Sequence, residues 1–108
     1  MNKAVLDKVM QVRGVKGAAI LESSGEVSAS RMDSKELVEF FGLLHRMANE
    51  QDGAPKLGDI RRIVVRTTDN EEDLSLVLKD KNALAIVSER SRPQTELFAE
   101  VTELLQQV

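Results

Sequence analysis

The stretch Asp33–Glu50, DSKELVEFFGLLHRMANE, is the longest helical pattern in the sequence and the one around which the fold is organised. At about 100° per residue its apolar positions fill an arc of roughly 160°, whereas a helix packed on one core needs about 100°. We therefore predict that this helix packs on its own sheet along one edge and on another molecule along the other. The arc consists of Leu37, Phe40, Phe41, Leu43, Leu44, Met47 and Ala48, with Val38 and His45 beside Phe41.

The composition is that of one folded domain. The chain has 108 residues, of which 42% are hydrophobic and 31% charged, and this is enough for a single core without a second domain. Cysteine is absent, which excludes a disulfide framework, a thiolate zinc site and a cysteine nucleophile, and fits a reducing cytoplasm. The start of the chain, MNKAVLDKVM, has no continuous apolar run, so we expect neither a signal peptide nor a membrane span.

Ahead of the central helix, the pattern predicts a short helix and a hairpin. Apolar residues recur at helical spacing over Asn2–Arg13, and Gly14 suits the left-handed position that ends a helix. Gly17–Glu22 and Glu26–Ser30 are extended runs joined by a turn that ends in glycine. Both faces of the first of these strands are expected to be covered.

The central helix is expected to begin at Asp33, because Glu36 three residues later completes a capping-box pattern. Beyond it, Asn49–Gly58 is polar and contains proline, which predicts a surface loop. Asp59–Thr68 is rich in β-branched residues and predicts a strand.

The last third of the chain predicts two more strands and a helix. Leu74–Leu78 alternates like a strand, and the acidic run Asp69–Asp73 before it is expected to be a hairpin loop. Ala83–Ser88 is almost entirely apolar, as in the middle strand of a sheet. Ser91 and Gln94 form a capping-box pattern ahead of a helix with a narrow apolar stripe. The elements predict an α+β fold in which hairpins join antiparallel strands.

This order of elements, with Gly14-Val15-x-Gly17-Ala18, Ser24-Gly25-Glu26-Val27, Ala29-Ser30 and Asn82-Ala83-Leu84-Ala85, resembles the roadblock/dynein light chain family, especially its short prokaryotic members. The resemblance covers nearly the whole chain and lies in the order and lengths of the elements rather than in one motif. It implies a profilin-like, three-layer α/β/α domain over residues 1–108. The sheet would have five antiparallel strands in the order 2-1-5-4-3, with helices 1 and 3 on one face and helix 2 on the other.

The resemblance also implies dimerisation through the second helix and the third strand, and Ras-like small GTPases as partners. The sequence agrees, because the third strand would be an apolar sheet edge, which is an aggregation hazard unless a twin strand covers it. The predicted interface with a second copy or another partner consists of Leu37, Phe40, Phe41, Leu44, His45, Met47, Ile63, Val64 and Val65.

Catalytic chemistry finds little support in the sequence. His45 is the only histidine, and no motif supplies the nucleophile or carboxylate that a general base requires, so a partner contact or a half-buried structural role is favoured. The serines Ser23, Ser24, Ser28 and Ser30 lack a nucleophile elbow and suit turn and strand-surface roles. We predict no catalytic residue, no cofactor and no metal.

Two charged runs have a structural and a functional interpretation. Asp69–Asp73 offers oxygen ligands for a divalent cation but lacks calcium-loop spacing, so a solvated loop is favoured. Arg61, Arg62 and Arg66 with Lys56 suit an acidic partner or a nucleic-acid backbone. Without an aromatic platform, and with a net charge of -3, charge that guards a strand edge is favoured over nucleic-acid binding.

The favoured hypothesis is a cytoplasmic, non-enzymatic homodimeric regulator or scaffold that binds a Ras-like small GTPase. The alternative is a small profilin-like ligand-sensing domain with a pocket between sheet and helix. An inward-facing set of polar groups would mark such a pocket, and the inward candidates are mostly Ala, Leu, Ile and Val. An enzyme is the third hypothesis.

Overall fold

The computed structural model describes residues 3–50, 60–66, 71–79 and 82–106. Its elements, in chain order, are α1 (Lys3–Met10), β1 (Val15–Leu21), β2 (Val27–Ser30), α2 (Lys35–Glu50), β3 (Ile60–Arg66), β4 (Glu72–Lys79), β5 (Asn82–Glu89) and α3 (Gln94–Gln106).

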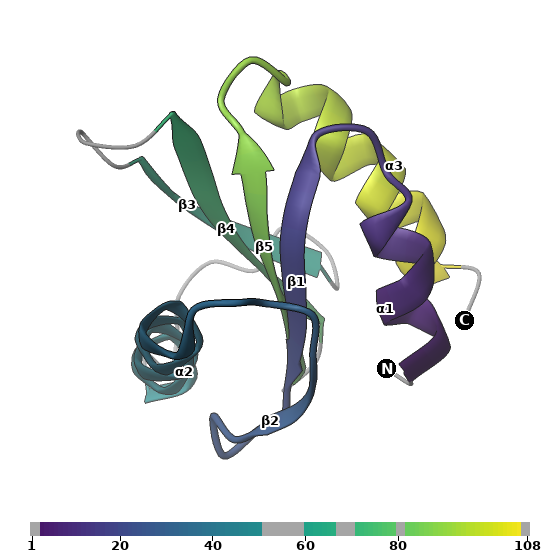
Figure 1. Cartoon of the computed structure of the whole chain (residues 1–108). Coiled ribbons are helices and arrows are strands. Elements are labelled where there is room, and N and C mark those ends of the chain that lie inside the picture. The colour runs from purple at the N-terminus through teal and green to yellow at the C-terminus, as the bar shows by residue number, and fades with distance from the viewer. Residues whose placement is uncertain (1–2, 51–59, 67–70, 80–81, 107–108) are drawn as a thin grey trace.

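The strands form one five-stranded sheet in the order β2-β1-β5-β4-β3, and all neighbouring strands are antiparallel. In Figure 1, α1 and α3 lie side by side on one face of the sheet and α2 lies on the other. This arrangement confirms the α+β class that the elements predicted, and the strand order and helix placement that the resemblance to the roadblock family implied. Among the described residues, no helix is long and apolar enough to cross a membrane.

The sheet separates two cores because alternate side chains of a strand point to opposite faces. On β5, Leu84 and Ile86 pack with α1 and α3, whereas Ala83, Ala85 and Val87 pack on the side of α2. All five are buried, so β5 is the central strand covered on both faces, as predicted. The β1 strand is likewise covered on both faces.

The connections around β1 use glycine where the backbone requires it. Gly14 and Gly25 have φ angles of 92° and 88°, a region that side chains disfavour, which confirms the predicted left-handed residue and the glycine turn. The first helix is shorter than predicted, because α1 ends at Met10 and the chain reaches β1 through a turn.

Both predicted capping boxes are wrong. Ser34, not Asp33, caps α2, since its Oγ accepts the Leu37 amide at 3.2 Å. With Ser34 as the cap, the third helical residue is Leu37. A capping box requires Glu or Gln there, and Glu36 is one position too early. At α3, the Gln94 side chain does not turn back toward Ser91; it donates to Asp73 and Ser88.

The strand boundaries differ from the prediction mainly at one place. The predicted strand Asp59–Thr68 appears as Ile60–Arg66, while β4 begins at Glu72, inside the run predicted to be a solvated loop. Asp73 is therefore a strand residue, and it is fully buried. The predicted loop Asn49–Gly58 lies outside the described residues beyond Glu50, where α2 ends.

Candidate interaction surface on α2 and β3

The inner side of α2 is fixed to the sheet. Phe41 is 1% exposed and joins the core cluster of Leu74, Leu76 and Leu78 on β4. His45, one turn later, is 0% exposed. Their burial removes Phe41 and His45 from the predicted interface, because a second molecule cannot reach them. It also contradicts the half-buried role expected for His45.

The neighbouring row of α2 is half-buried. Leu37, Leu44 and Ala48 pack against the same core cluster from the side of the helix that leads toward β3. Ile63 and Val65 of β3 pack partly against this cluster too. These residues form the border between the core and the surface.

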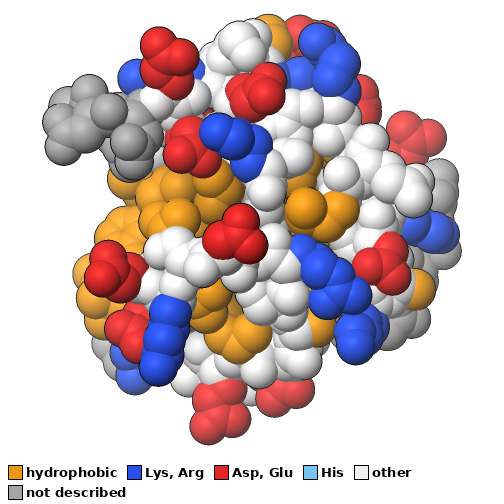
Figure 2. Space-filling model, in the orientation of Figure 1, with side chains coloured by type: hydrophobic (Ala, Val, Ile, Leu, Met, Phe, Trp, Pro, Cys, Tyr) orange, Lys and Arg blue, Asp and Glu red, His pale blue; other side chains and the backbone are white. Residues whose placement is uncertain are grey.

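The outer row of α2 is apolar and exposed. Phe40, Leu43 and Met47 are 36%, 48% and 52% exposed, and they account for three of the four large exposed hydrophobic side chains among the described residues. The ring of Phe40 lies 6.1 Å from that of Phe41, so it continues the core outward. Figure 2 shows hydrophobic side chains gathered on the side of the molecule where Figure 1 has α2 and β3.

The third side of α2 is held by the β1–β2 turn. A Cβ atom added to Gly42 would lie 3.0 Å from the Gly25 carbonyl oxygen, and one added to Gly25 would lie 2.8 Å from Cγ of Arg46. Only glycine at both positions lets the turn approach the helix this closely. The turn thus sets how α2 lies, and the outer row faces away from the sheet formed by the described strands.

Side chains of the edge strand β3 alternate between the face of α2 and the face of α3. Ile63 and Val65 point to the α2 side, and Arg62 lies on the opposite side, with its guanidinium 4.7 Å from the centre of the Phe98 ring. Arg62 also donates to the Gln94 carbonyl at 3.0 Å. These contacts hold Arg62 against α3.

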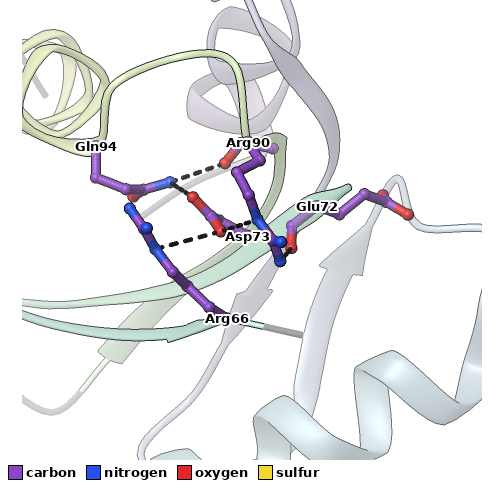
Figure 3. A network of polar contacts seen from close by, with 6 residues as sticks. Arg66, Glu72, Asp73, Arg90 and Gln94 are labelled. Carbon is purple, nitrogen blue, oxygen red and sulfur yellow. Dashed lines mark hydrogen bonds and ion pairs between the residues drawn. The ribbon is translucent and has the colours of Figure 1, made fainter. Parts of the chain in front are cut away.

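Arg66 lies on the same face as Arg62 and belongs to a polar network around the buried Asp73 (Figure 3). Its Nε lies 3.6 Å from Oδ1 of Asp73, and Nε of Arg90 lies 3.3 Å from the same oxygen. Gln94 completes the set by donating to the other carboxylate oxygen at 3.3 Å and to Ser88 at 3.1 Å. A buried carboxylate requires such partners, so Asp73 of β4 joins β3, the turn after β5 and α3 at one point.

Two of the basic residues expected to guard the β3 edge, Arg62 and Arg66, are described, whereas Lys56 and the side chain of Arg61 lie outside the described residues. The side chains of Arg62 and Arg66 lie across a face of the sheet and contact α3 or Asp73. Charges at a sheet edge discourage pairing with another strand, and this role of the two exposed arginines stays a prediction. No other strand of the described chain pairs with the outer side of β3.

The remaining candidate residues have local roles. Oγ of Ser24 accepts the Glu26 amide at 3.3 Å, and Oγ of Ser30 accepts the Met32 amide at 3.1 Å, as expected for turn serines. Asp73 is buried in its network and is thus not part of a solvated loop, while Asp69 and Asn70 of the same run lie outside the described residues. Within the described ranges, no three histidine, cysteine or acidic side chains are grouped to hold a metal ion.

The hollows near the helices are small or shallow. A groove of about 400 Å³ lies between α1 and α3, with Lys8 and Arg13 on one wall and Glu100 and Glu103 on the other. A second hollow, of about 170 Å³, lies at the start of α2 beside Met32 and Leu37. Neither is a deep apolar pocket with converging polar groups, as a small-ligand site requires.

The sequence did not indicate the exposure or burial of three residues that matter for the structure. Leu43 belonged to the apolar arc but not to the predicted interface, although it is among the most exposed apolar residues. Asp73 was assigned to a loop. Arg92, which is 4% exposed, donates to the Arg13 carbonyl and pairs with Glu100, and nothing in its local sequence signals burial.

Solved structures show what this arrangement is similar to. A Roadblock/LC7 domain from Streptomyces avermitilis matches with a TM-score of 0.72 at 18% sequence identity, covering 99% of this chain and 93% of that one. A second Roadblock/LC7 domain structure from the same organism also has a TM-score of 0.72, at 13% identity and with both chains fully covered. The chain has the roadblock fold. This confirms, for the fold, the resemblance drawn from the sequence.

The chain is also similar in fold to profilins. LokiProfilin2 in its complex with rabbit actin matches with a TM-score of 0.60 at 13% identity, covering 99% of this chain and 96% of that one. Profilin IA of Acanthamoeba castellanii has a TM-score of 0.56 at 17% identity and covers 95% of this chain and 91% of that one. No family model and no curated protein matches the sequence itself, so these likenesses concern the fold.

Proposed function

We propose that this chain is a non-enzymatic regulator or scaffold that forms a homodimer through α2 and β3 and binds a Ras-like small GTPase. The observation that carries the proposal is the exposed apolar row Phe40, Leu43 and Met47 beside an open edge strand. Large apolar side chains that group on a surface favour an interface with another protein. The likeness to Roadblock/LC7 domains supports the same assignment.

The dimer uses the parts of α2 and β3 that the chain itself leaves uncovered. The outer row of α2 supplies apolar area, and β3 supplies unpaired backbone amides and carbonyls along its outer side. Leu37, Leu44, Ile63, Val64 and Val65 border this surface, and all five are half-buried. Fully burying a large exposed side chain such as Leu43 or Met47 contributes about 1.5–3 kcal/mol, part of which offsets the free-energy cost of bringing two chains together.

Regulation by such a dimer is positional. A rigid surface that binds the switch loops of a GTPase changes their order, and the GTPase keeps its own catalytic residues. Arg46 is a candidate contact, since it is exposed on α2 and packs over Gly25 of the β1–β2 turn. We assign it no catalytic role.

The dimer is tested first by light scattering coupled to gel filtration. We expect twice the mass of the 12.0 kDa chain for the wild type. Met47→Glu is expected to give a folded monomer, because an ionised carboxylate does not fit an apolar interface. Glu39→Gln, on the exposed charged side of α2, is the matched control and should leave the dimer intact. A wild-type monomer at micromolar concentration would reject the dimer.

The GTPase is tested separately. A Ras-like small GTPase from the same organism, loaded with GDP or with a GTP analogue, is mixed with the dimer. Binding is followed by co-elution, and the rate of GTP hydrolysis is measured with GTP as substrate. We expect binding that depends on the nucleotide. If the GTPase binds in neither nucleotide state, the proposed partner is rejected, whether or not the homodimer is confirmed.

The ligand-sensing alternative is tested by a thermal-shift screen. The hollows described above give it no support, and we expect no saturable shift with small metabolites. One metabolite that raises the melting temperature with saturation would favour this alternative over the scaffold.

A further inference from the structure

Two β3 strands that pair as a homodimer have few registers available, and the described side chains distinguish between them. The inference rests on the proposed homodimer. A closed pair of identical chains has a two-fold axis, and each copy offers the same surface. In an antiparallel pair, residues that lie opposite each other point to the same face of the sheet.

The faces of β3 restrict where the axis lies. Ile63 and Val65 face α2, while Arg62 and Arg66 face the side of α3. An axis halfway between two residues would set an α2-facing side chain opposite an α3-facing one, which an antiparallel ladder does not allow. One residue of β3 must therefore lie opposite its own copy.

The arginines decide which residue that is. An axis at Val64 sets Arg62 of each copy opposite Arg66 of the other, and an axis at Arg62 sets the two copies of Arg62 opposite each other. Like charges directly opposite each other destabilise a strand pair. An axis at Val65 avoids opposed arginines, but the two copies of β3 then overlap only at the ends of the strands. An axis at Ile63 overlaps all 7 residues of Ile60–Arg66 and sets Arg62 opposite Val64.

Arg62 cannot easily turn away from an opposing charge. Its guanidinium is held by the Phe98 ring and the Gln94 carbonyl, and neither of these carries a negative charge. Moving it would give up both contacts. We propose that β3 pairs with β3 of a second copy in the register centred on Ile63, which places the two α2 helices on the same face of a continuous sheet.

Single-cysteine variants of the full chain test the register, because the sequence contains no cysteine. Ile63→Cys, Val64→Cys and Val65→Cys are oxidised under identical conditions, and the disulfide-linked dimer is measured over time by non-reducing electrophoresis. In the proposed register the two copies of residue 63 are neighbours, whereas those of residue 64 are displaced by roughly 7 Å along the strands, beyond disulfide reach. We expect Ile63→Cys to cross-link at least ~10-fold faster than either other variant, since only this pair meets that distance limit.

Each other outcome has a definite meaning. If Val64→Cys or Val65→Cys cross-links fastest, the register centred on Ile63 is wrong, but the homodimer is still supported. If no variant cross-links while light scattering still shows a dimer, β3 is not the seam, and the inference fails together with the proposed interface. A monomeric wild type rejects the proposed dimer itself.

A charge test gives a second readout that needs no cross-link. In the proposed register Val64→Glu lies opposite Arg62 of the second copy, and Val64→Lys repels it. Sedimentation equilibrium should show tighter dimerisation for Val64→Glu than for Val64→Lys, by about 10-fold for two such pairs. In a register centred on Val64, both variants oppose like charges, so equal weakening would overturn the inference.

Discussion

Helices α2 and α3 lie on opposite faces of one sheet and use their apolar residues differently. In α3, the stripe Leu97, Val101 and Leu105 is buried to 1% exposure or less, and the helix has no large exposed apolar side chain. In α2, Phe41 is equally buried, but Phe40, Leu43 and Met47 remain exposed. An apolar stripe as wide as the sheet requires serves folding, and apolar residues beyond that width are available to another molecule.

The largest effect is expected for the inner row of α2. Phe41→Ala removes the largest fully buried side chain and leaves a cavity in the core between α2 and the sheet. We expect a loss of about 3–5 kcal/mol in the free energy of unfolding, measured by urea denaturation. Leu97→Ala in α3 should cost about 2–5 kcal/mol, which would confirm that both inner stripes serve folding.

The outer row of α2 should behave in the opposite way. Phe40→Ala is expected to weaken dimerisation by ~10-fold or more, because about 1.5–3 kcal/mol of burial per large side chain is lost from the interface. The unfolding of the monomer should change by less than about 1 kcal/mol, as is usual for an exposed position. Dilution series by sedimentation and urea titrations separate these two quantities. If Phe40→Ala destabilises the monomer as much as Phe41→Ala does, the distinction between the two rows is lost.

The Asp73 network tests the other face of the sheet. Asp73→Ala leaves Arg90 and Gln94 without their carboxylate partner and should cost about 2 kcal/mol, a value within the range for hydrogen bonds to charged groups. The loss is moderated because Arg66 and Arg90 reach solvent. Urea denaturation is the measurement, and Glu71→Ala, at an exposed position just outside β4, is the control expected to have little effect. Equal effects for the two variants would contradict the role given to Asp73.

The smallest effect is expected at the contact between α2 and the β1–β2 turn. Alanine in place of glycine inside a helix usually stabilises it by about 0.5–1 kcal/mol. Gly42→Ala should instead be neutral or destabilising, because its Cβ would lie 3.0 Å from the Gly25 carbonyl oxygen. Thermal unfolding of the variant decides the sign. A clear rise in melting temperature would show that the turn yields easily and does not fix α2.

Most of the fold was predictable because its signals are local. The glycine turn at Ser23–Gly25 indicated the first hairpin, and the apolar run of Ala83–Ser88 marked the central strand, whereas the strand order was implied by the resemblance to the roadblock family. The excess width of the α2 arc was also visible, since it follows from helical spacing alone. In the structure, the apolar residues beyond the width that the sheet covers form the exposed outer row Phe40, Leu43 and Met47.

The failures concern residues whose surroundings are supplied by distant parts of the chain. Asp73 follows a run of polar residues and was assigned to a loop, yet Arg90 and Gln94 make its burial in β4 possible. Within the arc, nothing in the sequence told which of Phe40 and Phe41 would face the sheet. The choice between Asp33 and Ser34 as the cap was equally open, because both residue types cap helices well.

The segregation of the helices between the two faces bears on stoichiometry. A dimer joined along β3 would carry four helices on one face and only the pair of α2 helices on the other. A ligand bound on the two-fold axis of the α2 face would contact both chains at once. It would exclude a second ligand from that face. Titration would then saturate at one ligand per dimer. A site on the face of α1 and α3 would instead bind one ligand per chain.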